Sequence, residues 1–142
     1  MRMPTLSITE IANKYDIDVL AYFGSYQTEY YNKESDIDVG FLSSRTLSTD
    51  ELCSLLEELI IFHRKSEIDL VDLRTADPIL RYEVALNGRV LYEREKGLFE
   101  KYSLYYIKRH YELKHVMEDR VKRIGKAIEE VLEDARQLGD LQ

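Results

Sequence analysis

The chain has 142 residues, a formal net charge of −7 and a single cysteine, so it fits one domain with a hydrophobic core and forms no internal disulfide. Residues 1–95 carry 18 acidic and 10 basic side chains, whereas residues 96–142 carry 9 and 10, so the excess negative charge lies in residues 1–95. This argues against a long nucleic-acid substrate, because an acidic surface repels the phosphates whose contacts dominate nucleic-acid affinity. No apolar run approaches the ~20 residues of a membrane span, and the N-terminus lacks a secretory segment, so we expect a cytoplasmic protein.

The first elements that the sequence predicts are a short helix and a buried strand. The helix is expected over Thr5–Tyr15, because Ser7 and Glu10 have the three-residue spacing of a capping box. The strand is expected over Val19–Phe23, where apolar residues are continuous and run directly into a Gly-Ser pair.

A second predicted strand, residues 36–41, alternates aspartates with apolar residues. Side chains two positions apart on a strand point to the same face, so Asp36 and Asp38 converge on one patch. The ten residues that separate them from Gly24-Ser25 are polar and predict an exposed loop. An Asp-x-Asp pair alone is common at exposed strand ends, but beside a small-residue turn it is typical of a divalent-metal site for phosphoryl or nucleotidyl transfer.

The middle of the chain predicts a helix and then a third strand. Ser48 and Glu51 form a second capping-box pattern before a helix that runs to about Arg64. Cys53 lies in this helix, where we expect a buried structural thiol, and His63 is expected to end the helix rather than bind a metal.

The third strand, expected over Ile68–Leu73, brings further acidic residues. Asp69 is the candidate for a third carboxylate, and Glu67 has the same parity and could substitute for it or assist it. Asp72 has the opposite parity, so it is expected to cap or pair at the strand end. The alternative interpretation of Asp69 is an exposed acid on an edge strand.

Two short elements and a long helical segment complete the chain. Asp77 and Pro78 begin a helix that ends near Asn87-Gly88, and Arg89–Tyr92 predicts a short strand at an edge of the sheet. Residues 98–138 are helical in character and carry an apolar stripe. A core of this size cannot cover that stripe, so either the segment folds back as two helices or part of the stripe faces another chain.

The spacing Gly-Ser, ten residues, Asp-x-Asp resembles the signature of the nucleotidyltransferase superfamily with a polymerase-beta-type core. The small size and the order of elements resemble its minimal (MNT) branch, in particular the MntA-type antitoxins of HEPN/MNT toxin–antitoxin systems. A second matching region is Glu67–Arg74, followed by Pro78–Leu80 and Asn87–Tyr92. The resemblance implies an α/β (α+β) fold, with a short mixed sheet flanked by helices over residues 1–95 and a helical extension over residues 96–142.

The resemblance also implies roles for site residues. Asp36, Asp38 and Asp69 would be catalytic and would bind Mg²⁺, while Gly24 and Ser25 would bind the phosphates of ATP. Lys33 is the only cation of the loop and a further candidate phosphate contact. One departure is Glu29, which occupies about the place where many relatives carry a small or basic residue, and which makes the loop more acidic.

The expected function follows from the same resemblance. It is transfer of AMP from ATP to a tyrosine of a cognate HEPN-domain ribonuclease toxin, which neutralises the toxin. Two alternatives stay open: an antitoxin that acts by binding alone, and a nucleotidyltransferase that modifies a small molecule. A homo-oligomer that forms through the C-terminal helix is a further expectation.

Overall fold

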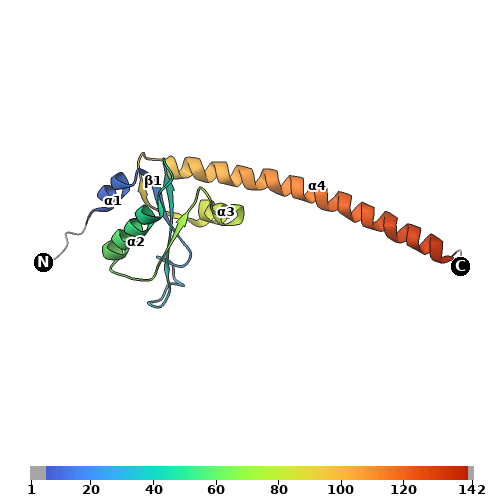
Figure 1. The fold of residues 1–142 in the computed structure, drawn as a ribbon, viewed down its shortest axis with the longest axis horizontal. Helices are drawn as coiled ribbons and strands as arrows, with labels where there is room; N and C mark the ends of the chain where they lie inside the picture. The colour runs from blue at the N-terminus through green and yellow to red at the C-terminus, as the bar shows by residue number, and fades with distance from the viewer. Residues whose placement is uncertain (1–5, 141–142) are drawn as a thin grey trace. The chain divides into compact units, whose positions relative to one another are not determined.

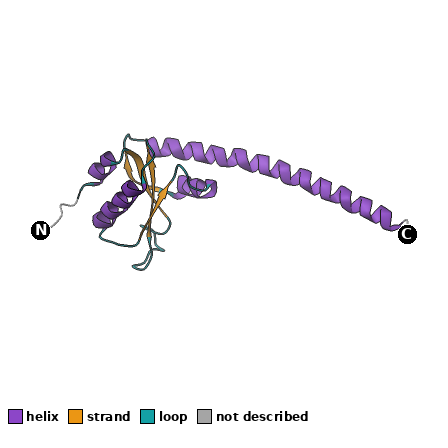
Figure 2. Ribbon diagram, viewed as in Figure 1, coloured by secondary structure: helices purple, strands orange, loops and turns teal. Residues whose placement is uncertain are grey.

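The computed structural model describes residues 6–140 of the chain (Figure 1). Thr5, where the first helix was expected to begin, lies outside the described residues. The helices and strands of the described part follow one another along the chain (Figure 2) as α1 (Ile8–Lys14), β1 (Ile17–Phe23), β2 (Ile37–Ser43), α2 (Thr49–His63), β3 (Ile68–Asp72), α3 (Pro78–Asn87), β4 (Arg89–Glu93) and α4 (Leu98–Asp140).

The strands form one mixed sheet in the order β3-β2-β1-β4. β1 is antiparallel to both β2 and β4, whereas β2 and β3 are parallel. β4 lies at an edge of the sheet, as the sequence predicts. The short mixed sheet expected from the resemblance is therefore confirmed.

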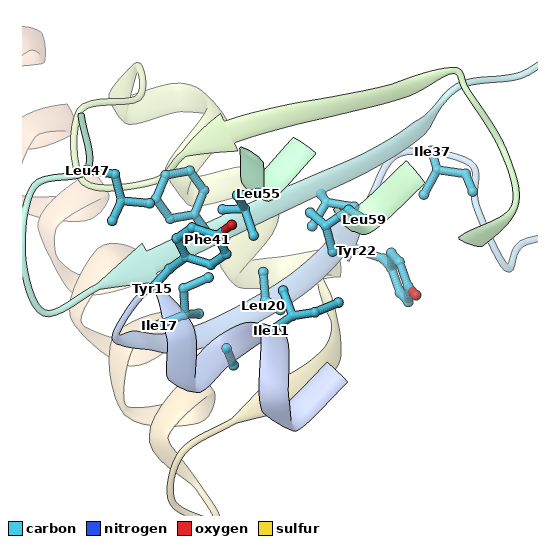
Figure 3. Close-up of a cluster of buried hydrophobic side chains, with 12 residues drawn as sticks. Ile11, Tyr15, Ile17, Leu20, Tyr22, Ile37, Phe41, Leu47, Leu55 and Leu59 are labelled. Atoms are coloured by element: carbon cyan, nitrogen blue, oxygen red, sulfur yellow. The ribbon is translucent and has the colours of Figure 1, made fainter. Parts of the chain in front are cut away.

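The core has one cluster of buried side chains on each face of the sheet. β1, at the centre, is buried at every residue. On one face, α1 and α2 pack their apolar residues against alternate residues of β1 and β2, including Leu20, Ile37 and Phe41 (Figure 3). On the other face, Val84 of α3 packs with residues such as Leu42, beside the first turn of α4. β2 is thus covered on both faces, which fixes the register of its aspartates.

The helix ends follow the capping signals in the sequence. Ser48 and Glu51 form a complete capping box at the start of α2, and Asp77 accepts a hydrogen bond from the Ile79 amide at the start of α3. The prediction for Cys53 was wrong, because its side chain is exposed. Leu55 and Leu59 lie on the face of α2 that packs against the sheet, and Cys53 lies on the opposite side of the helix.

The chain divides into two compact units, residues 1–107 and residues 108–142, with the boundary inside α4. α4 is one continuous helix from Leu98 to Asp140, so the segment does not fold back as two helices. No helix in the described part of the chain combines the length and the hydrophobicity that crossing a membrane requires.

Candidate functional site

The Gly-Ser turn begins where β1 ends, against the start of β2. Gly24 has a φ of 70°, a backbone conformation that costs little only for glycine. The preceding residue, Phe23, pairs with Asp38 in the antiparallel β1–β2 ladder. A Cβ atom added to Gly24 would lie 2.2 Å from Oδ2 of Asp38. The turn backbone therefore touches the carboxylate directly, and only a residue without a side chain fits there.

Asp38 and Asp69 are neighbours across the parallel β2–β3 ladder, where they are paired in register. Ile37 and Val39, on either side of Asp38, pack in the core against α1 and α2. Asp38 therefore points to the opposite face of the sheet, which α3 covers. Asp36 is not in the strand as expected, because β2 begins at Ile37, and its side chain is exposed just before the strand. Asp69 is exposed as well, while Asp38 is half-buried.

The charges of this acidic group affect one another. Burial, followed by the nearby carboxylates of Asp69, Asp36 and Glu83, raises the pKa of Asp38 above its ordinary value. Glu83 comes from α3, and no local pattern indicates it as a site residue, because only the packing of α3 on the sheet brings it near Asp38. Repulsion among these carboxylates is the electrostatic condition that a bound divalent cation relieves.

The chemistry of these side chains suits Mg²⁺, which takes oxygen ligands. Within residues 6–140, no three His, Cys, Asp or Glu side chains are grouped closely enough to enclose an ion by themselves. Mg²⁺ is usually bound through one or two carboxylates together with substrate phosphates and water, rather than in a cage made only of protein groups. Asp38 and Asp69, with Asp36 beside them, provide carboxylates of that kind at an exposed edge.

Arg89, the first residue of β4, holds the Gly-Ser turn from the other side. Its Nη2 donates to the carbonyl oxygens of Gly24 at 3.0 Å and Tyr26 at 2.6 Å, and its Nη1 donates to the Asn87 carbonyl at 3.1 Å. The guanidinium thereby fixes the turn on both sides of Ser25, which is half-buried. Sequence reasoning missed this residue, since an arginine at the start of an edge strand has no local signature.

Lys65, just beyond α2, ties down the rest of the loop. Its ammonium group donates to the Tyr31 hydroxyl at 2.7 Å, to the Lys33 carbonyl at 3.1 Å and to the Ser35 carbonyl. The Lys33 side chain is exposed, and only its backbone takes part in these contacts. The loop before Asp36 is therefore anchored to the core through Lys65.

An aromatic cluster packs the loop against the end of β1 and includes His63, the last residue of α2. The Tyr22 and Tyr26 rings pack edge to face with their centroids 4.7 Å apart, and the Tyr26 and Tyr31 rings pack in the same way with their centroids 5.1 Å apart. His63 lies within hydrogen-bond distance of the Tyr22 hydroxyl, at 2.6 Å, and of the Leu59 carbonyl, at 2.8 Å. The histidine ends its helix as expected and is engaged in packing.

The other two acidic candidates, Glu67 and Asp72, lie at the two ends of β3. Glu67 is exposed immediately before β3. Asp72 accepts a hydrogen bond from the Arg74 amide at 2.9 Å, which agrees with its expected role at the strand end. Tyr30, at the tip of the loop, exposes 79% of its surface and is available to a ligand or partner.

Comparison with known proteins identifies similar sequences. Residues 7–97 match the family described as polymerase beta, nucleotidyltransferase. Over 76 residues the chain is 33% identical to a protein of Shewanella oneidensis named protein adenylyltransferase MntA, and the match covers 54% of each chain. The chain thus matches about half the length of that relative.

Two solved structures show the similarity in fold. One, described as a toxin–antitoxin with AMP-PNP, has a chain with a TM-score of 0.66 and 24% identity, covering 82% of this chain and 94% of its own. The other holds a tri-AMPylated Shewanella oneidensis HEPN toxin in complex with an MNT antitoxin, with a TM-score of 0.61 and 24% identity over 82% and 92% of the two chains. Both confirm the expected arrangement of sheet and helices.

Proposed function

The chain belongs to the polymerase beta nucleotidyltransferase family, and from this we propose that it transfers AMP from ATP to a tyrosine hydroxyl of a cognate HEPN-domain toxin. The relative named protein adenylyltransferase MntA supports the choice of AMP as the transferred group. The chains of similar fold come from a complex with AMP-PNP and from one with a tri-AMPylated HEPN toxin, which supports ATP as donor and the toxin as acceptor.

The observation that carries the proposal is the contact between the Gly24 turn and Asp38. A phosphate-binding turn and a pair of carboxylates have to lie side by side for nucleotidyl transfer, because the phosphates lie on the turn and the carboxylates face the reacting phosphorus. Here the turn backbone lies against the carboxylate of Asp38, and Asp69 is its neighbour in the next strand. Amides of the turn at Gly24 and Ser25 would donate to the phosphates, with Lys33 as an additional cation.

The proposed step is a displacement at the α-phosphorus of ATP. The tyrosine oxygen forms a bond to the α-phosphorus, the bond between that phosphorus and the bridging oxygen breaks, and pyrophosphate leaves. Asp69, which is exposed beside Asp38, would accept the proton of the attacking hydroxyl. Asp36, Asp38 and Asp69 would hold Mg²⁺, which supplies charge neutralisation for the phosphates when it is bound.

The test is incubation of the purified chain with its toxin, labelled ATP and Mg²⁺, followed by intact-mass measurement of the toxin. We expect label on the toxin with the native chain and none with the double variant Asp36→Asn, Asp38→Asn. Glu34→Gln is the matched control, because Glu34 is an exposed acid of the same loop. Omission of Mg²⁺ tests the metal requirement separately.

The alternatives give different outcomes in the same experiment. If the double variant leaves the toxin unlabelled and yet still suppresses the ribonuclease activity of the toxin, neutralisation is due to binding alone. Unlabelled toxin in the presence of the native chain would contradict the proposed acceptor, and label on a member of a small-molecule panel would identify the acceptor class instead.

A further inference from the structure

The second unit of the chain, the part of α4 beyond residue 107, exposes a continuous apolar seam. Its residues alternate at spacings of four and three, which is the heptad pattern of a helix that packs along another helix. Their exposed fractions lie between 52% and 66%, and the large ones are Met117, Val121, Ile124, Ile128, Val131 and Leu138. Nothing within residues 6–140 covers these side chains, so the seam is suited to a separate chain.

The shape of the seam specifies a helical partner. Ile124, Ala127, Ile128 and Val131 stand at positions i, i+3, i+4 and i+7 and line a shallow, wholly apolar hollow. Four residues at this spacing form the hole that receives one side chain of a facing helix in knobs-into-holes packing. A flat sheet or an extended peptide presents no row of side chains with this repeat.

The order of charges along the helix selects the direction of the partner. Four basic side chains lie between residues 120 and 126, and four acidic side chains lie between residues 129 and 134. Of these eight charged side chains only Arg120 and Asp134 flank the seam. An antiparallel pair brings Arg120 of each helix beside Asp134 of the other, whereas a parallel, in-register pair gives neither of them an opposite charge across the seam. We propose that the partner is a second copy of this chain, packed antiparallel along the seam.

A single register satisfies both the apolar and the charged positions. Ile124 packs against Ile128 of the partner subunit, and Val121 packs against Val131 of the partner subunit. Arg120, which flanks the seam, then lies beside Asp134 of the partner subunit, and the symmetry repeats this opposite-charge contact. Ala127 meets Ala127 of the partner subunit at the centre, where small side chains allow the helices to approach closely.

The first test measures the oligomeric state of the full chain by sedimentation equilibrium. We expect a dimer of twice the 16.8 kDa chain mass, and a monomer for Ile124→Asp. Val116→Asp is the matched control, because Val116 is similarly exposed, at 60%, on the same helix but lies off the seam. Circular dichroism of each variant shows whether α4 is still helical.

The second test determines the direction of the helices. Arg120→Asp and Asp134→Arg should each raise the dissociation constant of the dimer about tenfold, and the double swap should restore it, because opposite charges face each other again. In a Cys53→Ser background, a short bis-maleimide should crosslink Ala127→Cys, which meets itself only in the antiparallel pair. Crosslinking of Ile124→Cys instead would indicate a parallel pair and overturn the proposal.

A native chain that sediments as a monomer at its highest soluble concentration would also overturn the proposal. The partner of the seam would then be a helix of a different protein. This inference does not depend on AMP transfer. A chain that dimerises without labelling any toxin supports the dimer alone, and a monomer that labels the toxin supports the proposed function alone.

Discussion

Gly24 lies directly against the Asp38 carboxylate, where the Gly-Ser turn meets the acidic group. Gly24 has a positive φ, and the Asp38 carboxylate occupies the space that a side chain at position 24 would need. Backbone conformation and close approach therefore require glycine at this position for two separate reasons. The two reasons can be separated because Gly97 shares only the first of them.

Gly24→Ala is expected to lower AMP transfer by about a hundredfold, because a displaced Asp38 no longer faces the reacting phosphorus. The left-handed backbone adds about 1–2 kcal/mol of instability. Gly97→Ala is the control: Gly97 has a φ of 89°, but nothing lies within 4 Å of an added Cβ. Transfer kinetics and thermal unfolding of both variants check this. Equal activity losses would show that backbone strain, and not the Asp38 contact, is responsible.

Arg89→Lys is expected to raise the KM for ATP about tenfold, because the shorter lysine has one nitrogen, whereas the planar guanidinium uses Nη2 to hold the two turn carbonyls and Nη1 to hold the Asn87 carbonyl at the same time. Arg94→Lys, just beyond the other end of β4, should leave KM unchanged, since a lysine can replace its ion pair with Asp18. Steady-state kinetics with varied ATP measure both. An unchanged KM for Arg89→Lys would mean that the turn keeps its shape without this contact.

The fold was predictable where local patterns decide it. Ser48 with Glu51, and Asp77 with Pro78, marked two helix starts that the structure confirms, because capping depends only on neighbouring residues. The alternation around Asp38 correctly indicated which residues of β2 face the core. Cys53 was misplaced, because an apolar run in a helix does not by itself show which side packs on the sheet.

The supporting residues of the site were not predictable, because long-range packing brings them to it. Arg89 reaches the turn from 65 positions away in the chain, and Lys65 reaches Ser35 from 30 positions away. Neither residue has a sequence signature near the motif that it supports. Glu83 is similar, since only the docking of α3 places its charge near Asp38.

Asp38→Asn is expected to stabilise the protein at neutral pH while AMP transfer is lost. Burial and the neighbouring carboxylates raise the pKa of Asp38, so the native state binds this proton more tightly than the unfolded chain does. The contribution of Asp38 to stability therefore falls as pH rises through its native pKa, and the neutral amide avoids that loss. We expect Tm to rise by on the order of 1–3 °C at pH 7. Asp36→Asn, at an exposed position, should change Tm less. A lower Tm for Asp38→Asn would contradict this electrostatic interpretation.

The hydrogen bond between Tyr22 and His63 predicts a loss of stability in acid. Nδ1 of His63 faces the Leu59 carbonyl and so must carry the proton, which leaves Nε2 to accept from the Tyr22 hydroxyl. Burial lowers the pKa of His63 below its ordinary value of 6.5, so its contribution to stability is complete above 6.5 and is lost as pH falls through the native pKa. His63→Gln should weaken the decrease in Tm between about pH 7 and about pH 5. His115→Gln, on the exposed part of α4, should leave that decrease unchanged. NMR titration of the native chain gives the His63 pKa directly, and a value at or above 6.5 would contradict the prediction.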